Sequence, residues 1–161
     1  MTSSLHVVPV ESLQRRANAL VAAAGKTPGI YVSLNKTHTS VQALLDKNHI
    51  NRDNLFFIDC VTMERIKEDV DDVLHIHPTD LDRLGQAIRA FIMEIRGKKY
   101  VLIDSLATLL IYNDHIAVAR FVKEVTEFAA SNDIDVFALS PVTKGEDLLN
   151  TIFNFFDTVK K

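Results

Sequence analysis

The chain has 161 residues and a formal net charge of −3, with 47% hydrophobic and 24% charged residues, which is ordinary for a globular protein with one substantial core. Charges of both signs are spread along the sequence, so no basic stripe favours nucleic acid as a partner. No apolar stretch has membrane-spanning length, the N-terminus lacks the layout of a signal peptide, and the lone Cys60 suits a reducing compartment.

Apolar runs of strand length recur along the chain. They cover residues 6–10, 30–34, 55–58, 100–103 and 134–139. Pro9 interrupts the first run, so we expect at most a short or edge strand there. Three of the other four are nearly continuous apolar runs, which is typical of parallel strands covered on both faces.

Segments with helical spacing of apolar residues separate these runs. They lie around residues 13–24, 41–45, 84–95, 118–129 and 148–156. We expect Ser40 to cap the second helix, the capping-box-like segment Thr79-Asp80-Leu81-Asp82 to open the third and Asn113 or Asp114 to begin the fourth. Strands alternating with helices predict one domain over 1–161, a three-layer α/β/α sandwich with a mainly parallel sheet.

The triplet Gly25-Lys26-Thr27 matches the end of a phosphate-binding loop. Such a loop needs an earlier glycine and must lie between a buried strand and a helix. Here Leu20 occupies the first glycine position, and the order is helix, turn, strand. We therefore interpret Gly25 and Gly29 as helix-stop and turn residues around Pro28.

Polar residues follow several predicted strands. In an open parallel sheet, ligands bind in the crevice past the carboxyl ends of the strands. The candidates for ligand binding are Asn35, Lys36, Thr37, Asp59, Asp104, Ser105 and Ser140. The amides from 36 to 40 could accept an anion at a helix start, although an ordinary capped start is the simpler interpretation. For Asp104 we favour a hydrogen bond to a neighbouring loop, because buried carboxylates need partners.

Two further patterns suggest weaker sites. His75 and His77 would share one face of an extended segment near Asp71 and Asp72, and imidazoles with a carboxylate bind zinc. The spacing fits no specific zinc signature, so we predict a solvated acidic loop and no metal site. Cys60 has no visible base nearby, which predicts a buried and unreactive thiol.

Five segments, in order, resemble the RecA superfamily, particularly its KaiC- and RadA-like ATPases. They are "GIYVSLNKTHTSVQALL" (29–45), "LFFIDCVT" (55–62), "KKYVLIDSLATLLIYN" (98–113), "DIDVFALSP" (133–141) and "LLNTIFNFFDTVKK" (148–161). The third resembles the Walker B segment, with Asp104 at the metal-organising position. The resemblance implies a RecA-like fold, and similarity to short archaeal RecA-like proteins of undefined role.

The chain departs from that family where its chemistry lies. The family's phosphate loop follows its first strand, whereas "HVVPVESLQRR" (6–16) runs straight towards a helix, with no glycine in 1–24. Asn35 stands where the KaiC-like pattern has a glutamate that acts on the attacking water, and an amide is no general base. The resemblance therefore implies no catalytic residues and no ATP or Mg²⁺ cofactor.

We expect a cytoplasmic, non-catalytic RecA-like module that binds protein partners or itself, by analogy with the pairing of RecA-like subunits. The alternative is a sensor that holds a small ligand or nucleotide in the crevice. An enzyme of another class is least favoured, because no nucleophile–base pair stands out in the sequence.

Overall fold

A seven-stranded sheet forms the centre of the computed structural model, which describes residues 2–62, 73–142 and 146–161. All strand pairs are parallel, in the order β4-β3-β2-β5-β6-β1-β7. The strands are β1 (Ser3–Val8), β2 (Gly29–Ser33), β3 (Leu55–Asp59), β4 (Val73–His75), β5 (Tyr100–Asp104), β6 (Asp135–Pro141) and β7 (Thr158–Lys160).

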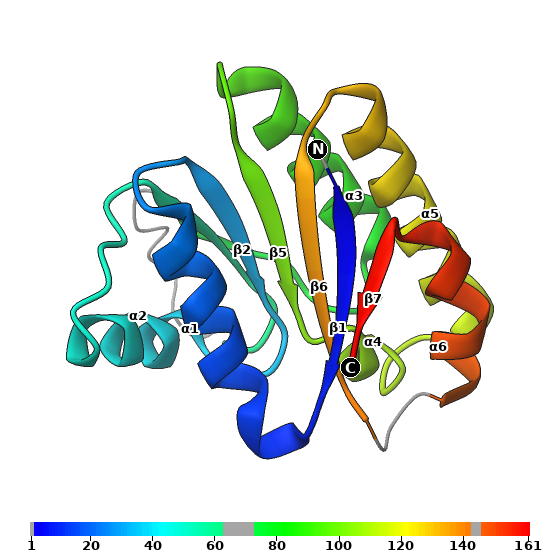
Figure 1. The fold of residues 1–161 in the computed structure, drawn as a ribbon. Coiled ribbons are helices and arrows are strands. Elements are labelled where there is room, and N and C mark those ends of the chain that lie inside the picture. The colour runs from blue at the N-terminus through cyan, green and yellow to red at the C-terminus, as the bar shows by residue number, and fades with distance from the viewer. Residues whose placement is uncertain (1, 63–72, 143–145) are drawn as a thin grey trace.

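Helices cover both faces of this sheet (Figure 1). They are α1 (Leu13–Ala24), α2 (His38–Lys47), α3 (Leu81–Glu94), α4 (Leu106–Leu109), α5 (His115–Ser131) and α6 (Glu146–Ile152), with 3₁₀ turns at Val10–Ser12 and Phe153–Phe155. α1 and α2 lie on one face, and α3, α5 and α6 lie on the other. The predicted three-layer α/β/α sandwich with a parallel sheet is therefore confirmed.

The apolar runs are continuous because successive strand residues enter different cores. On β5, Val101 and Ile103 pack in the core beneath α3 and α5. Tyr100 and Leu102 pack in the second core, beneath α1 and α2. Every residue of β5 is buried, as expected for a parallel strand covered on both faces.

The prediction for the first strand is wrong. β1 has six buried residues and pairs with β6 on one side and β7 on the other, so it is not an edge strand. Pro9 lies just past its end, where its missing N–H costs no ladder bond. The short strands β4 and β7 were not predicted, because three residues carry too little periodicity.

Helix boundaries follow local capping chemistry. Thr37, rather than the predicted Ser40, caps α2, because its hydroxyl accepts a hydrogen bond from the Ser40 N–H at 3.2 Å. Asp80 caps α3 within the predicted opening segment, and Asp114, one of the two predicted residues, caps α5. α1 ends at Gly25, whose φ of 58° favours glycine, and the chain then turns into β2. The helix–turn–strand order expected around Gly25-Lys26-Thr27 is confirmed.

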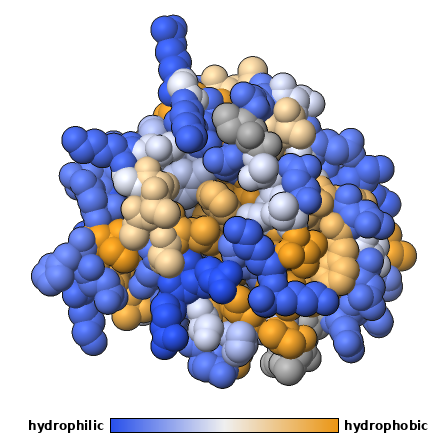
Figure 2. Space-filling model, in the orientation of Figure 1, coloured by the Kyte–Doolittle hydropathy of each residue, from blue (hydrophilic) through white to orange (hydrophobic). Residues whose placement is uncertain are grey.

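Polar residues dominate the surface in this view, with hydrophobic residues reaching it between them (Figure 2). Within the described residues, no helix combines the length and the apolar character needed to cross a membrane.

Close packing at Gly29 generates a prediction. A Cβ added there would overlap the ring of Tyr100, which is 3% exposed and has little room to move. We expect Gly29→Ala to lower the free energy of unfolding by about 1–3 kcal/mol, the usual cost of overpacking. Urea denaturation monitored by circular dichroism measures this change in the free energy of unfolding.

Gly85→Ala is the matched control. Gly85 lies in α3, and the nearest atom to an added Cβ is Nη1 of Arg89, 3.4 Å away at the end of a flexible side chain. Alanine should stabilise this helix by up to about 1 kcal/mol. Equal effects of the two substitutions would contradict the packing argument.

Candidate functional site

Three strand ends bring two of the predicted aspartates near each other. Ser33 at the end of β2 is in register with Asp59 on β3 and with Asp104 on β5. Neighbouring strands lie about 4.8 Å apart, so the two aspartates share one face of the sheet about 10 Å apart. The chain leaves β2 towards β3 and leaves β5 towards β6, in opposite directions. This is the crossover position at which open α/β sheets form a ligand crevice.

Asp59 lies at the centre of a dense hydrogen-bond network. Its Oδ1 accepts the N–H groups of Val61 and Thr62, both at 2.8 Å. Its Oδ2 accepts the Thr62 hydroxyl at 2.5 Å and the His38 N–H at 3.0 Å, and lies 2.6 Å from the His38 Nδ1. Burial alone would raise the pKa of Asp59, but the bonds from His38 and Thr62 outweigh it and lower the pKa to about 2. Asp59 is therefore a buried carboxylate that remains ionised at neutral pH.

Asp59 also occupies the anion position at the start of α2. The sequence allows the amides of residues 36–40 to bind an anionic ligand, but it favours an ordinary capped helix start. The capped start is what the structure has: Thr37 caps the helix, and the N–H of His38 donates to Asp59. A carboxylate beside a helix N-terminus is favoured by the helix dipole. The protein thus supplies its own anion there.

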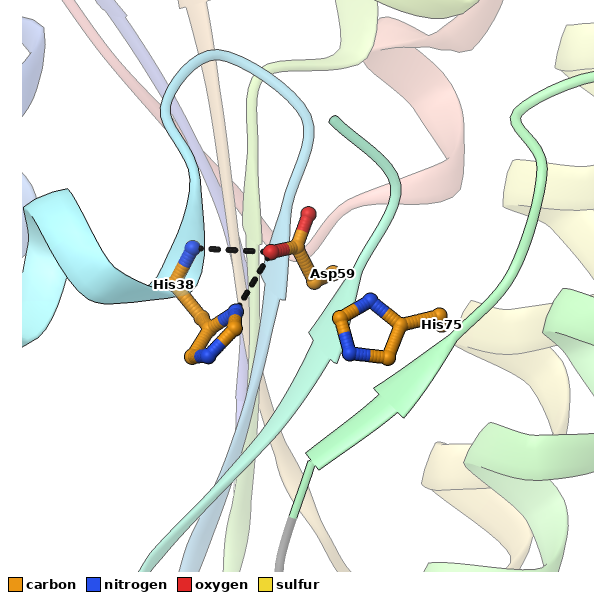
Figure 3. A group of neighbouring side chains, drawn as sticks. All are labelled: His38, Asp59 and His75. Carbon is orange, nitrogen blue, oxygen red and sulfur yellow. Dashed lines mark hydrogen bonds and ion pairs between the residues drawn. The ribbon is translucent and has the colours of Figure 1, made fainter. Parts of the chain in front are cut away.

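His75 completes a cluster with His38 and Asp59 (Figure 3). It ends β4 and is the register partner of Asp59. Its ring centroid lies 5.5 Å from that of His38, at an interplanar angle of 73°. The Nε2 of His75 is buried, and no hydrogen-bond partner for it lies within the described residues.

This cluster differs from the histidine grouping considered in the sequence. His77, expected beside His75, is exposed and bonds to Thr79 at 2.7 Å. Asp71 and Asp72 lie outside the described residues. The spacing of His38, Asp59 and His75 gives no local signal, because parallel pairing of β3 and β4 brings them together.

Asp104 has a different environment. Its Oδ2 accepts a hydrogen bond from the Tyr31 hydroxyl at 2.9 Å, so its partner is a side chain on β2 rather than the neighbouring loop we expected. Its Oδ1 is buried and has no partner among the described residues. Burial raises the pKa of Asp104, and the Tyr31 bond and the Lys36 charge oppose this only in part.

The other predicted crevice residues are dispersed. Asn35 is exposed, and Lys36 and Thr37 are half-buried in the loop before α2. Ser105 is buried at the start of α4, and Ser140 lies inside β6 with a buried Oγ that has no described partner. The structure therefore distributes the seven candidates along the sheet edge and does not gather them around one point.

Cys60 follows Asp59 and is 8% exposed. Burial, with a smaller contribution from Asp59, raises the pKa of its thiol to about 12. The predicted burial of Cys60 is therefore confirmed. A thiol at this pKa is protonated at neutral pH and a poor nucleophile, which supports the predicted lack of reactivity.

The Tyr31–Asp104 bond generates a stability prediction. Tyr31→Phe removes this donor from a carboxyl that is 1% exposed, and should lower the free energy of unfolding by about 1–3 kcal/mol. Tyr100→Phe is the matched control, because Tyr100 is also buried but its hydroxyl has no hydrogen bond among the described residues. Chemical denaturation of both variants tests this, and equal losses would show that the Tyr31 hydroxyl bond contributes nothing.

Two solved structures from one archaeon are similar to this chain. The KaiC-like protein PH0186 of Pyrococcus horikoshii matches with a TM-score of 0.61 and 9% identity, over 91% of this chain and 67% of that one. The uncharacterized protein PH0321 of the same organism, solved with an unknown peptide, matches with a TM-score of 0.69 and 13% identity, over 98% and 75%. Both share the fold of this chain, and identities this low show the fold alone.

Sequence comparison gives the family. Curated protein sequences yielded no match. Residues 3–159 match the Family of unknown function (DUF7504), which covers nearly the whole chain. The chain therefore belongs to the DUF7504 family, and its architecture is that of a KaiC-like α/β domain.

Proposed function

We propose that this chain is a non-catalytic RecA-like module that binds protein partners, a second copy of itself included. The observation that carries the proposal is that five exposed apolar side chains follow the carboxyl ends of β5, β6 and β1. These three strands are neighbours in the sheet.

Five residues form this surface, which we call the carboxyl rim. They are Val10, Ile111, Tyr112, Ile116 and Val142. They make up five of the seven large hydrophobic residues that are exposed in the described part of the chain, and Ile111 is 75% exposed. The Val142 N–H bonds to the Val8 carbonyl at 3.0 Å, which joins the ends of β6 and β1. Exposed apolar side chains at neighbouring strand ends offer apolar surface of the kind that protein partners cover.

The connection after β1 supports a role without ATP hydrolysis. The chain passes from Val8 through Pro9 and a 3₁₀ turn directly into α1. Within this turn the Ser12 N–H bonds to the Pro9 carbonyl at 2.8 Å, so it is already satisfied. A phosphate loop instead directs free backbone N–H groups at its ligand. The peptide bound to the fold neighbour from Pyrococcus horikoshii is consistent with protein or peptide binding.

A ligand sensor at the crevice is the second candidate function. The buried Oδ1 of Asp104 and Oγ of Ser140, both without partners in the described residues, favour it. Buried polar atoms are rarely left unsatisfied, and a bound molecule is one explanation.

Self-association is the first test. Sedimentation velocity over a range of protein concentrations should give a mass that rises above the 18.1 kDa of one chain. Ile111→Glu places a charge at the most exposed rim position and should restore 18.1 kDa, because burying an unpaired charge is costly. Met93→Glu is the control, since Met93 is 66% exposed but lies on α3, outside the rim. A wild-type chain that stays monomeric, or equal effects of both variants, would contradict self-association through the rim.

Nucleotide binding is the second test. We expect the thermal unfolding midpoint to stay unchanged with Mg²⁺-ATP or Mg²⁺-ADP. A ligand at about 100 times its dissociation constant would add roughly 2.7 kcal/mol to stability, an easily measured shift. A shift that Asp104→Ala abolishes would replace the non-catalytic proposal with a nucleotide site at the crevice. A shift with another metabolite in a panel would favour the sensor.

A further inference from the structure

His38, Asp59 and His75 converge from three separate elements. His38 is the first residue of α2, Asp59 ends β3 and His75 ends β4. One ligand atom from each side chain lies within 4.8 Å of the other two. Figure 3 shows both imidazole rings beside the carboxylate. The site is sheltered, because the side chains of His38 and Asp59 are 12% and 0% exposed.

The unsatisfied nitrogen of His75 is the second observation. Its Nε2 is buried, and the described residues offer it no partner. An orphaned polar atom calls for an explanation such as an ion or a water. A ring nitrogen beside a second imidazole and a buried carboxylate has the chemistry of a metal ligand.

We propose that His38, Asp59 and His75 bind one divalent transition-metal ion, with Zn²⁺ as the best fit. Two imidazoles and a carboxylate supply ligands that zinc accepts, and three protein ligands leave a position for water or an anion. Hard cations such as Mg²⁺ and Ca²⁺ prefer oxygen ligands, so the two imidazoles disfavour them.

The surroundings of Asp59 would orient it as a ligand. The backbone N–H groups of Val61 and Thr62, with the Thr62 hydroxyl, fix the carboxylate independently of the two histidines. Hydrogen bonds of this kind around metal-binding side chains hold them in position and tune the metal. These bonds can persist when the metal binds. The metal would replace only the bond between Asp59 Oδ2 and the His38 ring.

Metal uptake requires a small rearrangement of His38. Its Nδ1 lies 2.6 Å from Asp59 Oδ2, which is a hydrogen-bond distance. Two ligands about 2.0–2.2 Å from a tetrahedral ion are about 3.3–3.6 Å apart, so the ring must move away from the carboxylate. The hydrogen shared by the two atoms then passes to Nε2 of His38, which lies 3.5 Å from the Thr39 hydroxyl.

Zinc titration of the chelator-treated full chain tests the proposal. Isothermal titration calorimetry should give one Zn²⁺ per chain, and Co²⁺ in its place should give the visible absorption bands of a four- or five-coordinate site. His75→Ala should lower zinc affinity by about tenfold or more, because losing a direct ligand should cost at least as much as losing an outer-shell partner. His38→Ala should lower zinc affinity similarly. Two independent variants with the same loss make a folding defect peculiar to one of them an insufficient explanation.

His77→Ala is the matched control. His77 lies two residues from His75 but is exposed and bonds to Thr79, so its removal should leave zinc affinity unchanged. Absence of saturable binding at one ion per chain would overturn the proposal. Wild-type zinc affinity in both His38→Ala and His75→Ala would also overturn it. Neither result would affect the carboxyl rim, which lies at other strand ends.

Discussion

A parallel sheet covered on both faces leaves polar side chains room chiefly at the ends of its strands. β2 and β5 show this constraint, since every residue in both is buried. Their apolar side chains are divided between two cores, so a charged group inside either strand would lack water and partners. The acidic residues of β3 and β5, Asp59 and Asp104, therefore stand at the last strand position, where the strand leaves the two cores.

The two buried aspartates have pKa values shifted in opposite directions. Asp59 receives donors from backbone and side chains, and these lower its pKa to about 2 despite burial. Asp104 has one described donor, Tyr31, and burial prevails, so its pKa is raised. Surface exposure does not separate them, because both are 1% exposed. Asp104 lies deeper and has fewer hydrogen-bond donors, and both differences act in the same direction on its pKa. Asp59 therefore suits a cation, whereas Asp104 lacks the donors that would stabilise its charged form.

Sequence patterns predicted those parts of the fold that depend on local periodicity. The apolar runs located β2, β3, β5 and β6, and capping residues located the starts of α3 and α5. The first strand was misjudged because Pro9 was counted inside it, although it lies just beyond. β4 was not predicted, because it is three residues long and follows an acidic stretch whose composition is typical of a loop.

The candidate site was predictable only in part, for a physical reason. Asp59 and Asp104 follow apolar strands, so their place at the sheet edge could be inferred from position alone. The partners of each carboxylate depend on strand order and register. His75 reaches Asp59 only because β4 pairs beside β3, and Tyr31 reaches Asp104 only because β5 pairs beside β2. Neither pairing has a local signal in the sequence.

The carboxyl edge of the sheet is chemically divided, and the division bears on function. Around β2, β3 and β4 it carries His38, Asp59 and His75, whereas past β5, β6 and β1 it exposes the carboxyl rim. The ATPases that this chain resembles place a phosphate loop after their first strand. The corresponding position here holds Pro9 and the exposed Val10. An apolar side chain offers a phosphate no hydrogen bond but gains free energy when a protein covers it, which is the physical reason for proposing that this end of the sheet docks a protein.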